Sequence, residues 1–306
     1  MAFRNLMIET KAFVGLRHGN LLIKTDAERI VPIEDVNSIL IENTMSNITV
    51  AALSALAEVG ATVYICNAKH IPCAAMLPYV QHSRSFGMMK LQESLTMPMK
   101  KRLWQQVVIR KIGNQSKCLA ILGQKEAAEH LRQLEGKVHS GDPLNAEAEA
   151  ASFYFKSLFG KEFFRNDDAD IHNAALNYGY AIIRGQVARL IVSYGFLPTK
   201  GIHHKSELNA YNLADDFMEP FRPVVDLFVA QHFSSTPTEE WEETLTPPLK
   251  RELYNLLNMD ILSDGQYHSV AYAAEKLVHS FTRCCQKASK ELLLPELIPL
   301  KLHRYE

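Results

Sequence analysis

The spacing of the apolar residues changes near residue 80, and this change restricts the chain to folds that join a β-rich region to a helical region. Before it, short β-rich runs alternate with turns, as in residues 11–17 and 21–24 around His18-Gly19-Asn20. After it, apolar residues recur at helical steps, as in Leu103, Val107 and Ile112. We therefore expect an α+β protein with a small N-terminal β domain, residues 1–80, and a larger all-helical domain, residues 81–306.

Composition is that of an ordinary globular protein. The 306 residues are 47% hydrophobic and 22% charged, which allows a sizeable core. The five cysteines form no CxxC pair, so neither a zinc ribbon nor a disulfide framework is indicated. No apolar run approaches the roughly 18 residues of a membrane span, and no secretory leader is recognised. We expect a cytoplasmic protein with no membrane partner.

One segment is strongly basic although the net charge of the chain is only −1. Between His82 and Cys118 eight basic residues face a single acid, Glu93. Such a block is either a solvated helix face or a track for a phosphate backbone. The residues that we predict to contact DNA are Arg84, Lys100, Lys101, Arg102, Arg110 and Lys111.

Residues 201–223, GIHHKSELNAYNLADDFMEPFRP, combine histidines with acids. His203 and His204 lie on a glycine-led loop, and Asp216 and Glu219 share one face of the helix that follows. Proline at 220 and 223 predicts a bend just after Glu219. Arg222 lies between the prolines, where it is placed to pair with an acid or to reach a phosphate. The segment suggests a cation site, although a surface His pair and an exposed acidic face explain it equally well.

A second acidic element opens the segment EAEAASFYF. Glu147 and Glu149 fall in a first helical turn, where the helix dipole favours carboxylates and where acids are also commonly just exposed. One imidazole with two or three carboxylates suits Mg²⁺ or Mn²⁺ better than structural Zn²⁺. Such a cation polarises a phosphodiester and lowers the pKa of a bound water or 3′-hydroxyl. These residues therefore suggest a site that cleaves or transfers a phosphodiester.

Four motifs together resemble the CRISPR spacer-integrase family, and its type II branch in particular. EAEAASFYF resembles the family's E-(G/A)-x-A-A-x-x-Y-F helix, and HNAALNYGYAIIRG resembles its N-A-x-L-N-Y-G-Y helix. GIHH followed by NLADDFMEPFRP resembles the G-x-x-H … D-x-x-E-x-F-R-P block, and WQQVVIRKIGNQ resembles the basic helix with its K-I-x-N-Q tail. The resemblance covers most of the chain. Ala148 stands where the family often has glycine.

The resemblance implies a metal-dependent DNA endonuclease and integrase of CRISPR adaptation. Such an enzyme joins the 3′-hydroxyls of a short prespacer duplex to the repeat of a CRISPR array. The matching positions assign Glu147, His204 and Glu219 as ligands of Mg²⁺ or Mn²⁺, with Asp216 and Arg222 in auxiliary roles. Glu149 leaves some ambiguity about which glutamate binds the metal.

The resemblance also implies an assembly. The β domain would form a homodimer, and two homodimers would flank a dimer of the small second Cas protein around prespacer and repeat DNA. Type II relatives further involve the RNA-guided effector nuclease and a ring-shaped DNA-end-binding protein. Two other functions remain open from the residues alone: a DNA-binding scaffold without catalysis, and a metal hydrolase for small phosphoesters.

Overall fold

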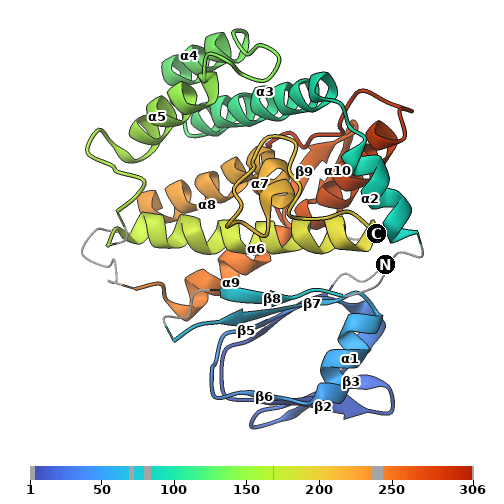
Figure 1. Ribbon diagram of the computed structural model, residues 1–306. Coiled ribbons are helices and arrows are strands. Elements are labelled where there is room, and N and C mark those ends of the chain that lie inside the picture. The colour runs from blue at the N-terminus through green and yellow to red at the C-terminus, as the bar shows by residue number, and fades with distance from the viewer. Residues whose placement is uncertain (1–3, 69–71, 79–83, 168, 236–243, 305–306) are drawn as a thin grey trace.

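The computed structural model describes residues 4–68, 72–78, 84–167, 169–235 and 244–304. A β-rich N-terminal region is followed by a helical region, which confirms the predicted α+β class (Figure 1). The predicted boundary at residues 80 and 81 falls outside the described residues.

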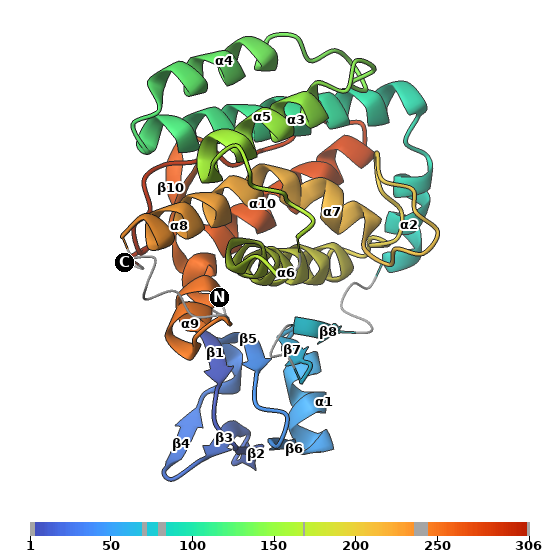
Figure 2. The ribbon, with the colours of Figure 1, turned by 90° about the vertical axis from the view of Figure 1, so that its left-hand side faces the viewer.

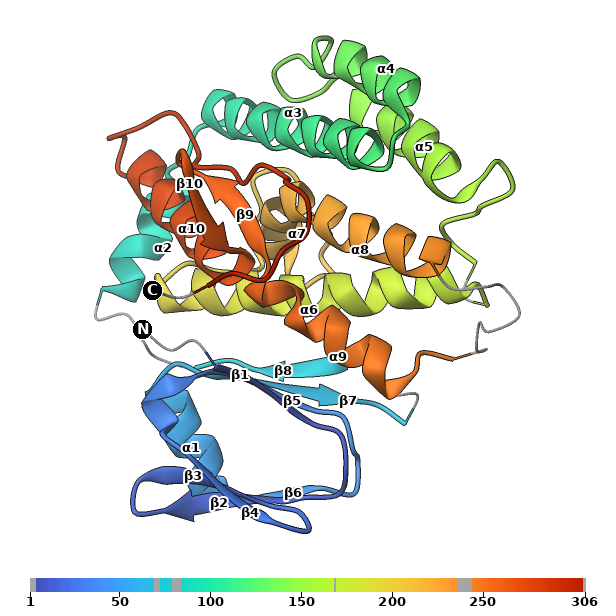
Figure 3. The same cartoon turned by 180° about the vertical axis from the view of Figure 1, so that it is seen from behind.

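Two four-stranded sheets form the N-terminal region. Its elements are β1 (Arg4–Ile8), β2 (Phe13–Arg17), β3 (Asn20–Lys24), β4 (Glu28–Val31), β5 (Val36–Ile41), β6 (Asn47–Ile48), α1 (Val50–Glu58), β7 (Thr62–Cys66) and β8 (Pro72–Met76). The sheet β1-β5-β7-β8 lies next to the helices, and the sheet β4-β3-β2-β6 lies beyond it (Figure 3). Helix α1 contacts β2 in one sheet and β7 in the other.

The predicted hairpin is present as β2 and β3. His18 and Gly19 form its turn with φ values of 49° and 76°, a conformation that suits glycine because it has no Cβ. Apolar residues from both sheets, among them Val14, Ile39 and Val63, make a core of their own. The N-terminal region is therefore held together by a core separate from that of the helices.

The helical region stacks in layers above the inner sheet (Figure 2). Its elements are α2 (Ser85–Glu93), α3 (Met97–Ile121), α4 (Lys125–Glu135), α5 (Ala146–Phe159), α6 (Ile171–Ser193), α7 (Asn212–Met218), α8 (Arg222–Ser235), α9 (Pro247–Asn255), β9 (Asp260–Ser263), β10 (Gln266–Ser269) and α10 (Val270–Cys285). Helices α3, α4 and α5 lie on the far side, α7 and α8 lie in the middle, and α6 runs beside the sheet.

The prediction that this region is all-helical is wrong in one detail. Strands β9 and β10 form an antiparallel hairpin closed by Asp264 and Gly265, both with positive φ. A two-residue Asp-Gly turn joins strands because its twist matches theirs. The hairpin packs against α10, so short strands complete a mainly helical core.

Two glycines of α6 permit close packing, as their positions inside a long helix suggest. A Cβ at Gly185 would collide with the ring of Tyr64 on β7, and one at Gly179 would lie 2.5 Å from Val225 on α8. Tyr64 also donates a hydrogen bond to the carbonyl of Ile182. Helix α6 is thus the element on which the sheet and the middle helices meet. No helix in the described parts of the chain is long and apolar enough to cross a membrane.

Candidate active site

The predicted site residues come from α3, α5, α7, the loop before α7 and the segment that joins α7 to α8. Helix α3 passes over a 3₁₀ turn, Glu219–Phe221, that links α7 to α8, and α5 lies beside α3. Asn114 of α3 fixes this turn because its side-chain amide donates to the carbonyl of Pro220 at 2.7 Å. The predicted bend after Glu219 is therefore present, and α3 holds it in place.

Glu147, rather than Glu149, faces the interior. Asp142 accepts hydrogen bonds from the backbone N–H groups of Ala146 and Glu147, so it caps the start of α5. The Glu147 carboxylate then accepts from Lys111 Nζ at 2.6 Å, whereas Glu149 is exposed. Of the two glutamates, Glu147 is therefore the one that shares Lys111 with Glu219.

Glu219 is buried, with its side chain only 5% exposed, and contacts two cations. Its Oε1 accepts from Arg222 Nε at 2.7 Å, and its Oε2 lies 2.5 Å from Lys111 Nζ. Burial by itself would raise the pKa of Glu219, but the charges of Arg222 and Lys111 outweigh it and lower the pKa to about 2. Glu219 is therefore ionised across the physiological range.

Lys111 does not lie on the surface with the other predicted DNA contacts. Its side chain is 10% exposed, and Nζ lies between Glu147 and Glu219. Burial favours the neutral amine, but the charges of Glu219 and Glu147 prevail and raise the pKa of Lys111. A pattern in the sequence marked this position, since Trp104, Val108 and Lys111 follow the buried face of α3 at helical spacing.

Asp216 organises the histidine loop from within the protein. It is fully buried and accepts hydrogen bonds from the backbone N–H groups of Ile202, His203 and His204 at 2.6–3.1 Å. A second contact joins Asp216 Oδ1 to His204 Nδ1 at 2.7 Å. Gly201 makes this possible, because a Cβ there would lie 2.6 Å from Asp216 Oδ2. The structure therefore places Asp216 behind the loop, as a support rather than at the centre of the site.

The two histidines differ in their surroundings. Trp104 of α3 stacks on His203, with ring centroids 4.0 Å apart, and meets His204 edge-on. The hydrogen bond to Asp216 raises the pKa of His204, while burial lowers the pKa of His203. With Nδ1 engaged by Asp216, His204 has Nε2 left for a ligand. Sequence reasoning missed Trp104, which fixes the loop that carries both histidines.

Arg222 pairs with an acid, which was one of its two expected roles. Besides binding Glu219, its guanidinium lies 4.4 Å from the ring centre of Tyr180. Tyr180 donates a hydrogen bond to the buried Asp226, and Tyr154 of α5 donates to the same carboxylate at 3.1 Å. Burial raises the pKa of Asp226 to about 6. This network, which the sequence did not reveal, joins α5, α6 and α8 behind the site.

The three predicted metal ligands are near one another but are not assembled around one point. In the described residues, no three His, Cys, Asp or Glu side chains are close enough to hold a metal ion. Their chemistry nevertheless fits Mg²⁺ or Mn²⁺, which take carboxylate oxygens and tolerate an imidazole. Glu219 Oε2 is buried and forms an ion pair with Lys111.

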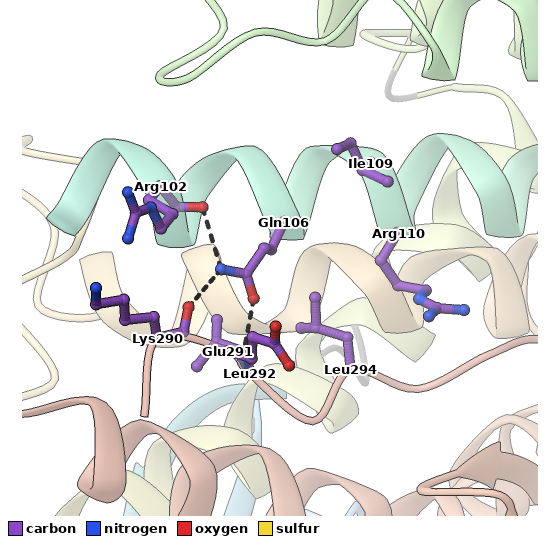
Figure 4. A pocket seen from close by; sticks show the side chains of 8 residues that line it. All are labelled: Arg102, Gln106, Ile109, Arg110, Lys290, Glu291, Leu292 and Leu294. Carbon is purple, nitrogen blue, oxygen red and sulfur yellow. Dashed lines mark hydrogen bonds between the residues drawn. The ribbon is translucent and has the colours of Figure 1, made fainter. Parts of the chain in front are cut away.

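The other predicted DNA contacts lie at the surface. Arg84, Lys101 and Arg102 are exposed, and Lys100 lines a hollow of about 560 Å³ that reaches His204. Arg102 and Arg110 border a second hollow, of about 550 Å³, between α3 and residues 290–294 (Figure 4). Arg110 is also paired with Glu296 at 2.9 Å. The six predicted DNA contacts therefore comprise residues at the surface, among them Arg110 in its pair with Glu296, and the buried Lys111.

The β-rich region and most of the helical region match the model of one known protein family. The family described as "CRISPR associated protein Cas1" matches residues 6–243, and the chain belongs to this family. The CRISPR-associated endonuclease Cas1 of Neisseria meningitidis is 44% identical over 308 residues, covering 100% of both chains. A Cas1 endonuclease of Pyrobaculum aerophilum is 29% identical, covering 80% of this chain and 85% of its own.

Solved structures share the fold at low sequence identity. A casposase bound to its integration product superimposes with a TM-score of 0.76 at 19% identity, covering 95% of this chain and 92% of its own. A Cas1 protein of Thermotoga maritima gives 0.74 at 15% identity, covering 95% and 99%. The similarity includes both the β-rich and the helical regions.

Proposed function

We propose that the protein is a divalent-metal-dependent DNA endonuclease and integrase of CRISPR adaptation. It takes a short prespacer duplex and uses the 3′-hydroxyls of the duplex to attack phosphodiesters of the CRISPR repeat. The observation that carries the proposal is that Glu147 and Glu219, from two separate elements, both lie within 2.6 Å of the Lys111 ammonium. Membership of the Cas1 family supports the same reaction class.

Each site residue has a defined part in this proposal. Glu147, Glu219 and the Nε2 of His204 would hold Mg²⁺ or Mn²⁺, and Asp216 keeps the imidazole in the required orientation through Nδ1. The bound cation would polarise the repeat phosphodiester and favour ionisation of the attacking 3′-hydroxyl. Arg222 holds Glu219 in place, and no nucleophile from the protein is needed because the attacking group belongs to DNA.

The DNA duplex would lie across the exposed cations of α2 and α3. Arg84, Lys101 and Arg102 are placed to contact phosphates, and Lys100 continues this surface to the hollow beside His204. A similar structure, with a TM-score of 0.56, is described as a TtCas1-DNA complex, which supports a DNA partner. Contacts with phosphates position the duplex without reading its sequence.

The proposed assembly is a cytoplasmic complex. The N-terminal region would form a homodimer, and two homodimers would flank a dimer of the small second Cas protein. A related structure, with a TM-score of 0.74, is described as a Cas6-RT-Cas1–Cas2 complex. The type II effector nuclease and a DNA-end-binding protein complete the set of proposed partners.

A strand-transfer assay with Mn²⁺, a prespacer duplex and a repeat substrate tests the function. We expect Glu147→Gln, His204→Asn and Glu219→Gln each to abolish joining while the protein still binds duplex DNA. Glu149→Gln is the matched control, because Glu149 is exposed two residues from Glu147 and should retain joining. DNA binding by the unaltered protein without metal-dependent nicking or joining would instead identify a scaffold. Preferred turnover of a chromogenic phosphodiester would identify a small-phosphoester hydrolase.

A further inference from the structure

The Lys111 ammonium lies between the carboxylates of Glu147 and Glu219, which are two of the predicted metal ligands. Its Nζ is 2.6 Å from Glu147 Oε1 and 2.5 Å from Glu219 Oε2. The three side chains come from α3, α5 and the 3₁₀ turn, and are 10%, 22% and 5% exposed. A single ammonium is therefore the common partner of two acids that lie far apart in the sequence.

Electrostatics explains why a cation is held there. Two carboxylates within reach of one point repel each other strongly in a poorly solvated site unless a positive charge lies between them. Arg222 neutralises Glu219 from the Oε1 side, but the contact shared with Glu147 is made by Lys111. Removing the ammonium would leave the Glu147 carboxylate facing Glu219 across a gap suited to another cation.

We propose that Lys111 is a built-in competitor of the divalent metal ion. Its ammonium holds Glu147 and Glu219 in place in the metal-free protein and must leave at least one of them before the metal binds. The inference rests on the proposed function, because it takes these glutamates as metal ligands. It makes Lys111 a positioning residue that sets metal affinity.

A metal titration of the full-length protein tests this inference. Lys111→Met removes the charge and keeps a flexible apolar chain of similar length. We expect calorimetric titration with Mn²⁺ to give binding about tenfold tighter or more, the scale on which residues behind metal ligands act. Without metal, the variant should unfold at a lower temperature than the unaltered protein, and Mn²⁺ should raise its unfolding temperature by more.

Lys117→Met is the matched control. Lys117 lies on the same helix and pairs with Glu296, away from the two site glutamates. Its replacement should leave Mn²⁺ affinity unchanged. If Lys111→Met fails to fold, Lys111→Arg serves instead, because its permanently charged, forked guanidinium should hold both carboxylates and weaken Mn²⁺ binding.

The outcomes separate this inference from the proposed function. Unchanged or weaker Mn²⁺ binding in folded Lys111→Met overturns the inference, as does unchanged binding in Lys111→Arg. If the unaltered protein still joins DNA with Mn²⁺ in such a case, the proposed function stands. If neither the unaltered protein nor Lys111→Met binds Mn²⁺, both the inference and the metal-dependent function are overturned.

Discussion

Among the residues that the structure describes, two buried lysines form ion pairs, and their surroundings differ. Lys250 of α9 binds Glu42, next to the end of β5, at 2.8 Å, with side chains only 8% and 4% exposed. Lys111 is buried to a similar degree but lies between two carboxylates. The first pair links the helical region to the inner sheet, whereas the second collects acids from separate elements within the helical region.

The difference lies in how many acids share one cation. One lysine facing one glutamate is locally neutral, and its geometry suffices to join two elements. One lysine facing two glutamates draws together negative charges that would otherwise separate, which is the charge arrangement of a cation-binding site. The two lysines are therefore buried to a similar degree, and the number of carboxylates that converge on each is what distinguishes them.

The largest expected effect on stability is at the structural pair. Lys250→Met removes the cation from the buried Glu42, and losing one partner of a buried pair typically costs about 3–5 kcal/mol. Urea unfolding followed by circular dichroism measures the change, and Mn²⁺ affinity should not alter. Lys276→Met, which breaks a partly exposed pair with Asp264, should cost less than about 1 kcal/mol. A similarly small loss in Lys250→Met would show that the buried pair does not hold the regions together.

The next effect concerns acid stability at Glu219. Its pKa is about 2 in the folded protein and 4.5 when unperturbed, so its stabilisation is present above pH 4.5 and is lost as the pH falls toward 2. At about 1.4 kcal/mol per pKa unit the loss approaches roughly 3 kcal/mol. Glu219→Gln should remove this part of the pH dependence when free energies of unfolding are compared at pH 5 and pH 3. Parallel profiles for the two proteins would contradict the lowered pKa.

Asp226 should show the opposite dependence, and a slightly smaller one. Burial raises its pKa from 3.8 to about 6, so the folded protein retains a proton that the unfolded chain has lost. The contribution of Asp226 to the free energy of unfolding therefore falls as the pH rises from 3.8 to 6 and is constant above that range. Asp226→Asn should flatten the profile between pH 4 and pH 7 in the same unfolding measurement. A steeper decline in the variant would argue against the raised pKa.

The smallest effect on stability is expected from the exposed cations of α3. Changing Lys100, Lys101 and Arg102 to glutamate should alter the unfolding free energy by less than about 1 kcal/mol in total, as is usual for surface sites. The same change should reduce the slope of log K for DNA binding against log salt by about 0.9 for each phosphate that the variant no longer neutralises. Fluorescence anisotropy at several salt concentrations measures the slope. An unchanged slope would indicate that these residues form a solvated helix face and do not contact DNA.

Local patterns were sufficient to predict much of the fold. The turn at His18 and Gly19, the helical spacing after residue 84 and the bend at Glu219 each depend on neighbours in the sequence, and each is present in the structure. The family resemblance selected Glu147, His204 and Glu219 as metal ligands and Asp216 as an auxiliary residue. In the structure Glu147 and Glu219 contact the same lysine, and Asp216 contacts His204. Their roles toward a metal remain predictions.

The features that were missed depend on contacts between distant elements. Lys111 looks like part of a basic block until α5 and the 3₁₀ turn bring two acids to its side of α3. The β9–β10 hairpin had its Asp264-Gly265 signal in the sequence, but strands of four residues are too short to show a clear alternation between helical segments. Asp226 gave no signal, because its two tyrosine partners lie 46 and 72 residues away.

Helix α3 runs from the surface of the protein into its interior. It carries Arg102 toward solvent, while Trp104 supports the histidine loop and Lys111, two turns or about 10 Å further along, sits between the glutamates. The helix is continuous over 25 residues. A displacement of its outer end would therefore move the support of the histidine loop and the internal ammonium together.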